Sequence, residues 1–238
     1  MNREKLTEII AYICSKTGVS YTFTRHLKYE LEHTLLRCRK AISPCFHKKI
    51  GNYRKLKDLK INFGCGPIFQ NGWINVDSHN TKGVDLVIDL RSNLPFSDGS
   101  AKYIFSEHFI EHLEFPNEAL KFLSECHRIL SSFGTVRIIT PDAAKYIRAY
   151  VLNDSEFFSH SDIGETPKIE ILNRVFSEEG FHKFCYDYEA LYLLLEEAGF
   201  RNIVKSNFNS SIHPELRIDF SNKWRQVSSL YMEASKVN

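Results

Sequence analysis

The sequence predicts an α/β protein built on a doubly wound, mostly parallel seven-stranded sheet, with a helical appendage at the N-terminus. Two observations predict this class. From residue 60 onward, short apolar runs alternate with stretches whose apolar residues recur at helical spacing, a pattern typical of a parallel sheet covered on both faces. The first apolar run ends in a Gly-x-Gly turn, as a buried strand does when it enters a tight turn.

The N-terminal part is expected to form two helices, over residues 3–16 and 24–40, because leucines and isoleucines recur there at helical spacing. Gly18 separates them, and Ser43-Pro44 ends the second. Residues 45–59 are predicted to be a basic linker. We therefore expect an appendage over residues 1–59 and the main domain over residues 60–238.

Within the main domain, strands are expected at 60–63, 73–76, 84–88, 101–105, 134–139, 202–206 and 227–234. The last two are predicted to pair as an antiparallel edge. Helices are expected at 116–130 and at 187–198, the second with Gly199 just beyond its end. Residues 151–180 are polar and show no clear period, so we predict an insertion, and we assign residues 151–186 as a lid or acceptor region.

Composition excludes several classes of protein. The six cysteines are scattered without a Cys-x-x-Cys pair, which favours reduced thiols in a cytoplasmic protein over a disulfide framework or a zinc site. No apolar run approaches the length of a membrane span, and the N-terminus has no signal-peptide core. With 43% apolar residues in 238, the chain can bury a full core.

The net charge of +2 conceals an asymmetry along the chain. Residues 1–60 hold 14 Lys and Arg against 5 Asp and Glu, and the remainder holds 17 against 24. A segment of charge +9 can contact anionic lipid, nucleic acid or a phosphorylated substrate. A solvated helical face lying on an acidic domain explains the same charges. Both interpretations stay open.

The segment 60–67, Lys-Ile-Asn-Phe-Gly-Cys-Gly-Pro, carries the strongest local signal. Gly64 and Gly66 can take positive φ and let a ligand reach the backbone. Asp77 closes the next apolar run, where a carboxylate can bind ribose hydroxyls. Phe69 stands where a dinucleotide site needs a small third residue, which weakens the dinucleotide interpretation.

Two further strand ends carry polar residues. Asp89-Leu90 follows the third predicted strand, where a carboxylate can accept from an adenine amino group while the leucine lies against the ring. Ser106-Glu107-His108 begins a histidine-rich turn after the fourth. In open α/β sheets ligands bind at this carboxyl edge of the strands.

The motifs described above, taken in order, resemble those of a known enzyme family. The block from Ile61 to Asp142 resembles a class I S-adenosylmethionine-dependent methyltransferase with a Rossmann-like fold, and is most similar to small bacterial methyltransferases found with surface-polysaccharide genes. The matching phrases are 62–67, 72–77, 89–90, 94–96, 106–108, 111–113, 128–130 and 134–142. A looser similarity extends to Ala234, so it covers roughly 175 residues and leaves residues 1–59 outside.

The resemblance implies a cofactor site for S-adenosylmethionine. Carried onto this chain, it assigns the Gly64-Cys65-Gly66 turn to the amino-acid portion of the cofactor, Asp77 to the ribose, Asp89 and Leu90 to adenine, and Ser106 with Glu107 to the methyl group's border. One departure concerns the connection between the first two strands. Nine residues separate Phe63 from Trp73, too few for a full crossover helix, so we predict a turn or an irregular path there.

Methyl transfer to a hydroxyl needs a base near the acceptor, and histidine suits that role. The candidates are His108, His112 and His182, each of which can also be a packing residue. Helical geometry would not point Glu107, His108, Glu111 and His112 one way, so no metal is expected.

The predicted function is methyl transfer from S-adenosylmethionine to an oxygen of a small-molecule or glycan-type acceptor such as a sugar or nucleotide sugar. A nucleic-acid methyltransferase is disfavoured because Ser106-Glu107-His108-Phe109 replaces the Asn/Asp-Pro-Pro-Tyr/Phe motif of amino-directed enzymes. A non-catalytic subunit that binds the cofactor for a partner stays a second alternative. The sequence leaves the oligomeric state open.

Overall fold

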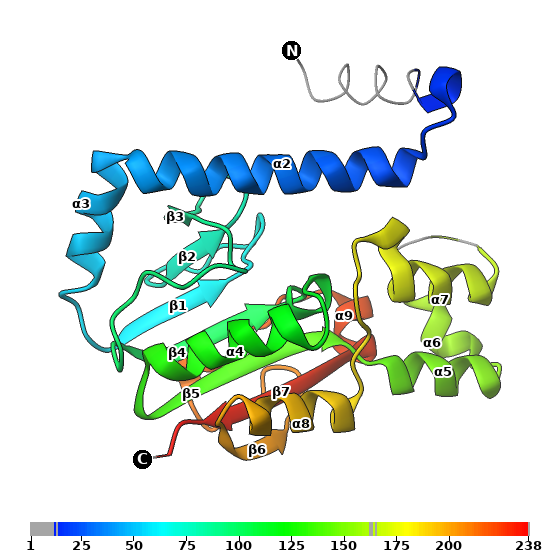
Figure 1. The fold of residues 1–238 in the computed structure, drawn as a ribbon. Helices are drawn as coiled ribbons and strands as arrows, with labels where there is room; N and C mark the ends of the chain where they lie inside the picture. Colours follow the sequence, from blue (N-terminus) through cyan, green and yellow to red (C-terminus); the bar gives the residue numbers. More distant parts are fainter. Residues whose placement is uncertain (1–11, 13, 162–163, 165, 238) are drawn as a thin grey trace. The chain divides into compact units, whose positions relative to one another are not determined.

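A computed structural model describes residues 12, 14–161, 164 and 166–237. By its contacts the chain divides into two compact units, Met1–Pro44 and Cys45–Asn238. The first unit contains helix α2, Tyr21–Ile42, which begins after the N-cap Ser20 (Figure 1). This confirms the helix expected at 24–40. Of the helix expected at 3–16, residues 12 and 14–16 are helical, and the rest lies outside the described residues.

The second unit is organised by a sheet in which seven strands are described, in the order β3-β2-β1-β4-β5-β7-β6. β1 to β5 run parallel, and β7 pairs antiparallel with both β5 and β6. The doubly wound fold and its antiparallel C-terminal strand are thereby confirmed. The bounds are Leu59–Phe63 (β1), Ile74–Asp77 (β2), Leu86–Val87 (β3), Ala101–Glu107 (β4), Leu130–Pro141 (β5), Arg201–Lys205 (β6) and Ser229–Ser235 (β7).

Several strands differ from their predicted extents, and β5, Leu130–Pro141, begins four residues before its predicted start. β3 is two residues long where five were expected at 84–88. β7 begins at Ser229, because helix α9, Lys223–Ser228, occupies the residues immediately before it. Asn222 caps α9 by accepting from the Arg225 backbone N–H at 3.0 Å, which fixes where the helix starts.

The linker predicted at 45–59 is wrong in its first part, because helix α3 spans Pro44–Tyr53. Ile50 of this helix is buried, and Phe46 and Tyr53 pack against the main core. These three positions share one helical face. The many lysines around them concealed that apolar spacing in the sequence.

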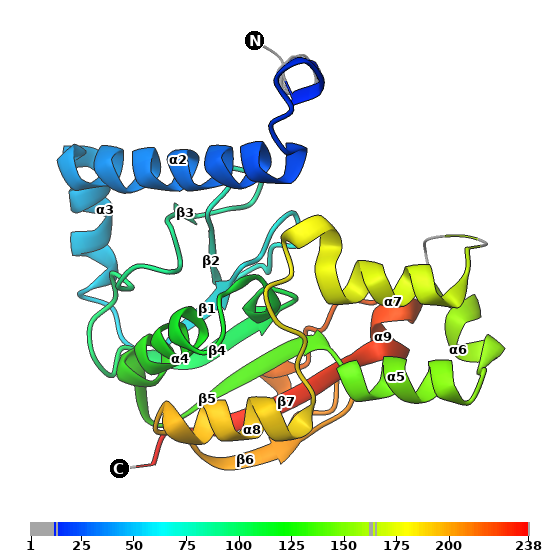
Figure 2. The same cartoon turned by 45° about the vertical axis from the view of Figure 1, so that its right-hand side comes forward.

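Helices α4, Asn117–Ile129, and α8, Tyr188–Glu197, confirm the two helices predicted for the main domain. They lie side by side on one face of the sheet, and most of their leucines, Leu123, Leu191, Leu194 and Leu195, are buried in its core (Figures 1 and 2). Asp187 caps α8 by accepting from the Ala190 backbone N–H at 2.9 Å, and Gly199 follows its end at φ +100°. Capping and burial together explain why these helices were readable in the sequence.

The segment predicted as an aperiodic insertion at 151–180 is largely helical, which corrects that prediction. It follows α5, Ala143–Val151, and contains α6, Ser155–Ser159, α7, Lys168–Ser177, and the 3-10 helix η2, Glu178–Gly180. α5, α6, α7 and α9 share a small core of their own, formed by Tyr146, Ala149, Phe158, Ile171, Leu172, Val175 and Trp224. Each helix is short and changes direction at its cap, so no single period runs through the stretch.

The connection from β1 to β2 contains turns and no helix between Gly64 and Trp73, as predicted. Two buried amides support it. The Asn62 side chain donates to Asn75 Oδ1 at 3.1 Å and to the Ile68 carbonyl at 3.3 Å. Asn75 in turn donates its backbone N–H to Asp85 at 2.8 Å. An irregular connection lacks the internal backbone hydrogen bonds of a helix, and these bonds satisfy buried polar groups within and beside it.

Among the described helices, none combines the length and the apolar character that crossing a membrane requires.

Candidate active site

The predicted site residues come from four neighbouring strands that end at one edge of the sheet. β1 runs into the glycine turn, β2 ends at Asp77, Asp89 follows β3, and β4 ends at Glu107. Because these strands are parallel, their carboxyl ends meet at the same edge, where open α/β sheets bind ligands. The topology therefore gathers residues from Gly64 to His108, more than forty positions apart in the chain.

The two glycines of the turn have different surroundings. Both have positive φ, +66° at Gly64 and +52° at Gly66. A Cβ placed on Gly64 would lie 2.5 Å from Cβ and Cγ of Phe109, whereas a Cβ on Gly66 would meet no atom within 4 Å. Phe109 therefore fills the space beside Gly64, and the open backbone for a ligand is at Gly66. An open, left-handed glycine at a strand end fits the close approach of a cofactor.

Asp77 is buried behind this turn and receives two backbone hydrogen bonds. Its Oδ2 accepts from the Gly66 N–H at 2.8 Å, and its Oδ1 accepts from the His79 N–H at 2.8 Å. Burial alone would raise the pKa of Asp77, but the hydrogen bonds from His79 and Gly66 outweigh it and hold the pKa below its usual value. The carboxylate is ionised at neutral pH and retains lone pairs for ribose hydroxyls.

Cys65, between the two glycines, is 6% exposed. Burial, with Asp77 nearby, raises the pKa of its thiol to about 12. The side chain is a neutral thiol at physiological pH, so it contributes packing to the turn and no nucleophile.

Asp89 lies after β3 and is held by a neighbouring cation. Its two oxygens accept from the Arg91 guanidinium at 3.0 and 3.1 Å, and Oδ1 also accepts from the Arg91 backbone N–H. Leu90 is buried, with 3% of its surface exposed. A bidentate pair of this kind orients the carboxylate firmly, and the adenine contact assigned to Asp89 and Leu90 stays a prediction.

The side chains of Ser106 and Glu107, at the end of β4, differ in their hydrogen bonds. Ser106 Oγ is buried and has no hydrogen-bond partner among the described residues. Glu107 accepts from the Phe220 backbone N–H at 3.0 Å and from Arg225 at 3.2 Å. Burial raises the pKa of Glu107 despite these bonds. Glu107 thus fastens the C-terminal segment to the sheet edge, while Ser106 offers an unpaired hydroxyl.

His108 has a left-handed backbone, with φ +52°. This conformation is uncommon for a residue with a Cβ and is worth explaining by function when it stands at a strand end. Its Nε2 lies 3.0 Å from the Ser229 hydroxyl, and its Nδ1 lies 3.4 Å from Glu111 Oε1. Burial, with Arg225 nearby, lowers the pKa of His108 well below its ordinary value, so the imidazole is neutral at physiological pH.

The three predicted histidines gather around one carboxylate. Glu111 and His112 belong to the 3-10 helix η1, Ile110–His112, and His182 follows η2. The rings of His112 and His182 have centroids 4.8 Å apart. Burial raises the pKa of Glu111 to about 8, and burial, with His182 nearby, lowers the pKa of His112. No sequence pattern predicted that His182 would lie beside η1, seventy residues earlier in the chain.

Ser229 and Thr140, which were not predicted as site residues, complete this cluster. Ser229 begins β7 and reaches His108 across the sheet edge, and the Thr140 hydroxyl donates to Glu111 Oε2 at 3.1 Å. Both are fully buried hydroxyls at the end of a strand. Buried hydroxyls at the carboxyl edge of a sheet are the signal that could have found them.

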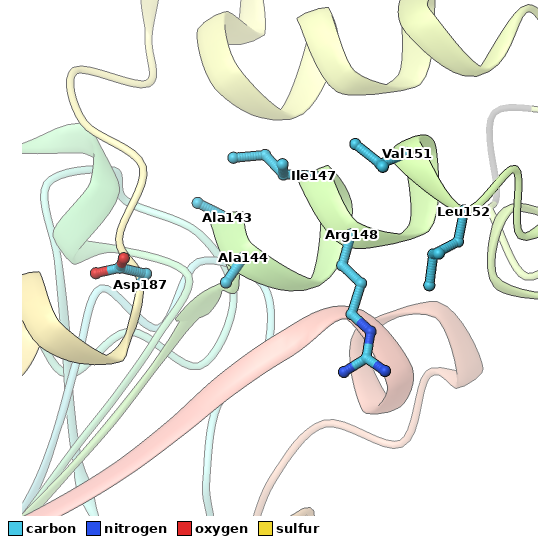
Figure 3. Close-up of a pocket in the computed structure, with 7 residues that line it drawn as sticks. All are labelled: Ala143, Ala144, Ile147, Arg148, Val151, Leu152 and Asp187. Atoms are coloured by element: carbon cyan, nitrogen blue, oxygen red, sulfur yellow. The ribbon is translucent and has the colours of Figure 1, made fainter.

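A surface pocket lies beside this site along α5. It is lined by Ala143, Ala144, Ile147, Arg148, Val151, Leu152 and Asp187 (Figure 3). Its lining is mostly apolar and includes none of the predicted site residues. We place the candidate active site at the strand ends, where the polar groups converge, and not in this pocket.

Comparison with known proteins agrees with this geometry. Residues 63–138 match the profile of a family described as a methyltransferase domain. This stretch of the chain is similar to methyltransferase domains. The matched residues run from the end of β1 into β5 and include the glycine turn and His108. No curated protein matches the sequence.

Several solved structures are similar to this chain. An S-adenosylmethionine-dependent methyltransferase from Archaeoglobus fulgidus is 19% identical, with 87% of this chain and 99% of that chain covered and a TM-score of 0.47. A possible histamine N-methyltransferase from Thermotoga maritima is 17% identical, with 90% and 96% covered and a TM-score of 0.46. A methyltransferase solved in complex with the Trm112 activator of Haloferax volcanii is 12% identical, with 81% and 89% covered and a TM-score of 0.47. At these identities no substrate or partner carries over.

Proposed function

We propose that the methyltransferase domain methylates a hydroxyl of a small-molecule or glycan-type acceptor, with His108 as the base. The observation that carries this proposal is the contact between His108 Nε2 and the Ser229 hydroxyl at 3.0 Å. In the tautomer whose proton is on Nδ1, Nε2 accepts from the serine hydroxyl and can accept from a substrate hydroxyl in the same direction. The glycan class rests on the resemblance to methyltransferases found with surface-polysaccharide genes.

The cofactor supplies an electrophilic methyl group on a sulfonium. The residues of this chain would hold its parts and remove the acceptor's proton. Gly66 leaves the backbone open, and Asp77 presents an ionised carboxylate. His108 takes the proton at Nε2, and Glu111 Oε1 lies 3.4 Å from Nδ1 on the other side of the ring. His112 and His182 are the weaker base candidates, because each uses Nδ1 on a backbone carbonyl and adjoins Glu178.

The test uses purified protein, S-adenosylmethionine and a panel of nucleotide sugars and hydroxylated glycans, with S-adenosylhomocysteine release and mass gain of the acceptor as readouts. His108→Asn is the informative variant, because asparagine tolerates positive φ and the substitution removes only the imidazole. We expect its kcat to fall by about 10²–10⁴-fold with cofactor binding retained. His160→Asn, at the C-terminal cap of α6, is the matched control and should keep the parent kcat.

Two results would contradict this proposal. A kcat within about threefold of the parent for His108→Asn would remove His108 from the base role. Cofactor binding without turnover of any panel member would remove the glycan class. Strong salt-dependent RNA binding would then favour the nucleic-acid alternative, and turnover restored by a second protein would favour the partner-subunit alternative.

We further propose that α2 binds an anionic lipid surface. Phe23, Leu27, Leu31 and Leu35 recur every four residues, and between 48% and 59% of each is exposed. The helix also carries five Lys and Arg against two Glu. An apolar stripe with basic flanks is the pattern of helices that lie in the headgroup region, where anionic lipids attract each basic residue.

Vesicle co-sedimentation tests this second proposal. The protein should sediment with phosphatidylserine-containing vesicles and stay in solution with phosphatidylcholine alone, and Leu27→Ser with Leu31→Ser should reduce binding at least about tenfold. Leu193→Ser is the matched control, because Leu193 of α8 is 55% exposed and lies outside α2. Equal binding to both vesicle types, or unchanged binding by the α2 variant, would overturn the proposal.

A further inference from the structure

We propose that Glu111, His112 and His182 form a binding site for a divalent first-row transition metal ion such as Zn²⁺. One carboxylate oxygen of Glu111 and one ring nitrogen from each histidine all lie within 4.8 Å of one another. Two imidazoles and a carboxylate are a donor set that suits Zn²⁺ and its neighbours in the first transition row. Glu111 also faces the proposed base His108, but the proposed metal site does not depend on the identity of the methyl acceptor.

The first supporting observation is the protonation state that the backbone imposes on both rings. His112 Nδ1 lies 3.3 Å from the Phe181 carbonyl, and His182 Nδ1 lies 2.5 Å from the Val175 carbonyl. A carbonyl oxygen only accepts, so each Nδ1 carries the proton and each Nε2 keeps its lone pair. Metal-binding histidines are oriented in this way, with the second ring nitrogen donating to a carbonyl or carboxylate.

The second observation is an unsatisfied carboxylate oxygen. Glu111 is fully buried, and its Oε2 accepts from Thr140, but its Oε1 has no hydrogen-bond partner among the described residues. His108 Nδ1 lies 3.4 Å from Oε1 without the geometry of a hydrogen bond. A buried carboxylate oxygen left in this state costs free energy unless a cation or a donor reaches it.

The third observation is the position of Glu178. Its Oε2 lies 3.2 Å from His182 Nε2 and 3.7 Å from His112 Nδ1. Two lone pairs that face each other at 3.2 Å are held together by a proton or by a metal ion. The Glu178 side chain is half-exposed, so it can supply a fourth ligand while water fills any remaining position.

Such an ion would join two segments that are far apart in the chain. η1 and the segment after η2 already share backbone hydrogen bonds, because the Lys183 N–H donates to the Glu111 carbonyl at 2.7 Å. A metal bound by Glu111, His112 and His182 would fasten the region predicted as a lid to the sheet edge. Binding to the folded state would also raise the unfolding temperature.

Isothermal titration with Zn²⁺ alone tests the proposal, after chelator treatment of the purified full chain. We expect one Zn²⁺ per chain, and an affinity at least about 100-fold lower for Glu111→Gln and for His182→Gln, since loss of a ligand should exceed the 10–100-fold cost of losing an outer partner. His160→Asn, outside the cluster, should bind as the parent does. The parent with Co²⁺ in place of Zn²⁺ should show the visible absorption of a four- or five-coordinate site.

Two results of this titration would overturn the proposed metal site. Absence of Zn²⁺ binding by the parent would overturn the site, and so would stoichiometric binding that neither substitution weakens, because the ion would then sit elsewhere. If Glu111→Gln does not fold, His182→Gln decides, since it changes a side chain that only partly lines the core. None of these readouts needs the methyl acceptor, so failure of the proposed function leaves this test intact.

Discussion

The two glycines of the Gly64-Cys65-Gly66 turn should respond very differently to alanine. Both Gly64 and Gly66 have positive φ, which costs a residue with a Cβ about 1–2 kcal/mol. At Gly66 that is the whole cost in stability, because a Cβ there meets no atom within 4 Å. At Gly64 the new Cβ would lie 2.5 Å from Phe109, and overpacking of this kind adds about 1–3 kcal/mol.

Phe109 cannot easily move aside. Its ring packs edge-on against Phe122, with centroids 5.1 Å apart, and Phe122 is buried in the main core. We therefore expect Gly64→Ala to destabilise the domain by about 2–5 kcal/mol and Gly66→Ala by about 1–2 kcal/mol. Each kcal/mol lowers the melting temperature of a chain this size by about 2–4 °C.

Thermal unfolding and S-adenosylhomocysteine titration together check this reasoning. Gly66→Ala should keep most of its melting temperature yet bind S-adenosylhomocysteine at least about tenfold more weakly, a loss of about 1.4 kcal/mol. Adding Phe109→Ala to Gly64→Ala should recover the overpacking part, seen as a coupling of about 1–3 kcal/mol in the double-mutant cycle. Equal destabilisation by the two glycine substitutions, or full cofactor affinity in Gly66→Ala, would refute the assignment of the open backbone to Gly66.

Three further predictions concern other parts of the domain. Arg137 is fully buried and pairs with Asp219 at 2.5 Å, so Arg137→Met should cost about 3–5 kcal/mol in urea unfolding, and a cost below 1 kcal/mol would contradict this. Cys65, with its pKa raised to about 12, should resist a thiol reagent at pH 8 that labels the exposed Cys38; equal labelling rates in the native protein would show that the turn opens. Asp187→Ala should lose the α8 cap, about 1 kcal/mol, whereas Asp187→Ser should lose much less.

The sequence predicted the elements that its local chemistry determines. The helix at α4 and the one at α8 have an apolar face, and α8 also has a capping aspartate and a terminal glycine, so their bounds came within about two residues. The strands next to the glycine turn were readable because their apolar runs are buried on both faces. α3 was missed because its apolar face has only three positions among many basic residues.

The candidate site was predictable to the extent that strand ends determine it. Gly66, Asp77 and His108 follow parallel strands, and the topology brings such positions to one edge. Side chains that arrive from elsewhere could not be placed. Ser229 reaches His108 because β7 inserts antiparallel beside β5, a pairing between residues far apart in the chain that leaves no mark on either segment alone.

His182 is another side chain whose position in the site could not be predicted from the sequence. Its partners are set by the Val175 carbonyl at the end of α7 and by η1, which lies seventy residues earlier. Helical spacing argued against a metal site built from residues 107–112 alone, because successive side chains on one turn diverge. A site shared between η1 and a distant segment avoids that restriction, because the orientation of His182 is set by its own segment and not by the geometry of η1. The proposed ion therefore depends on a tertiary contact that periodicity cannot describe, and Zn²⁺ titration of His182→Gln examines that contact directly.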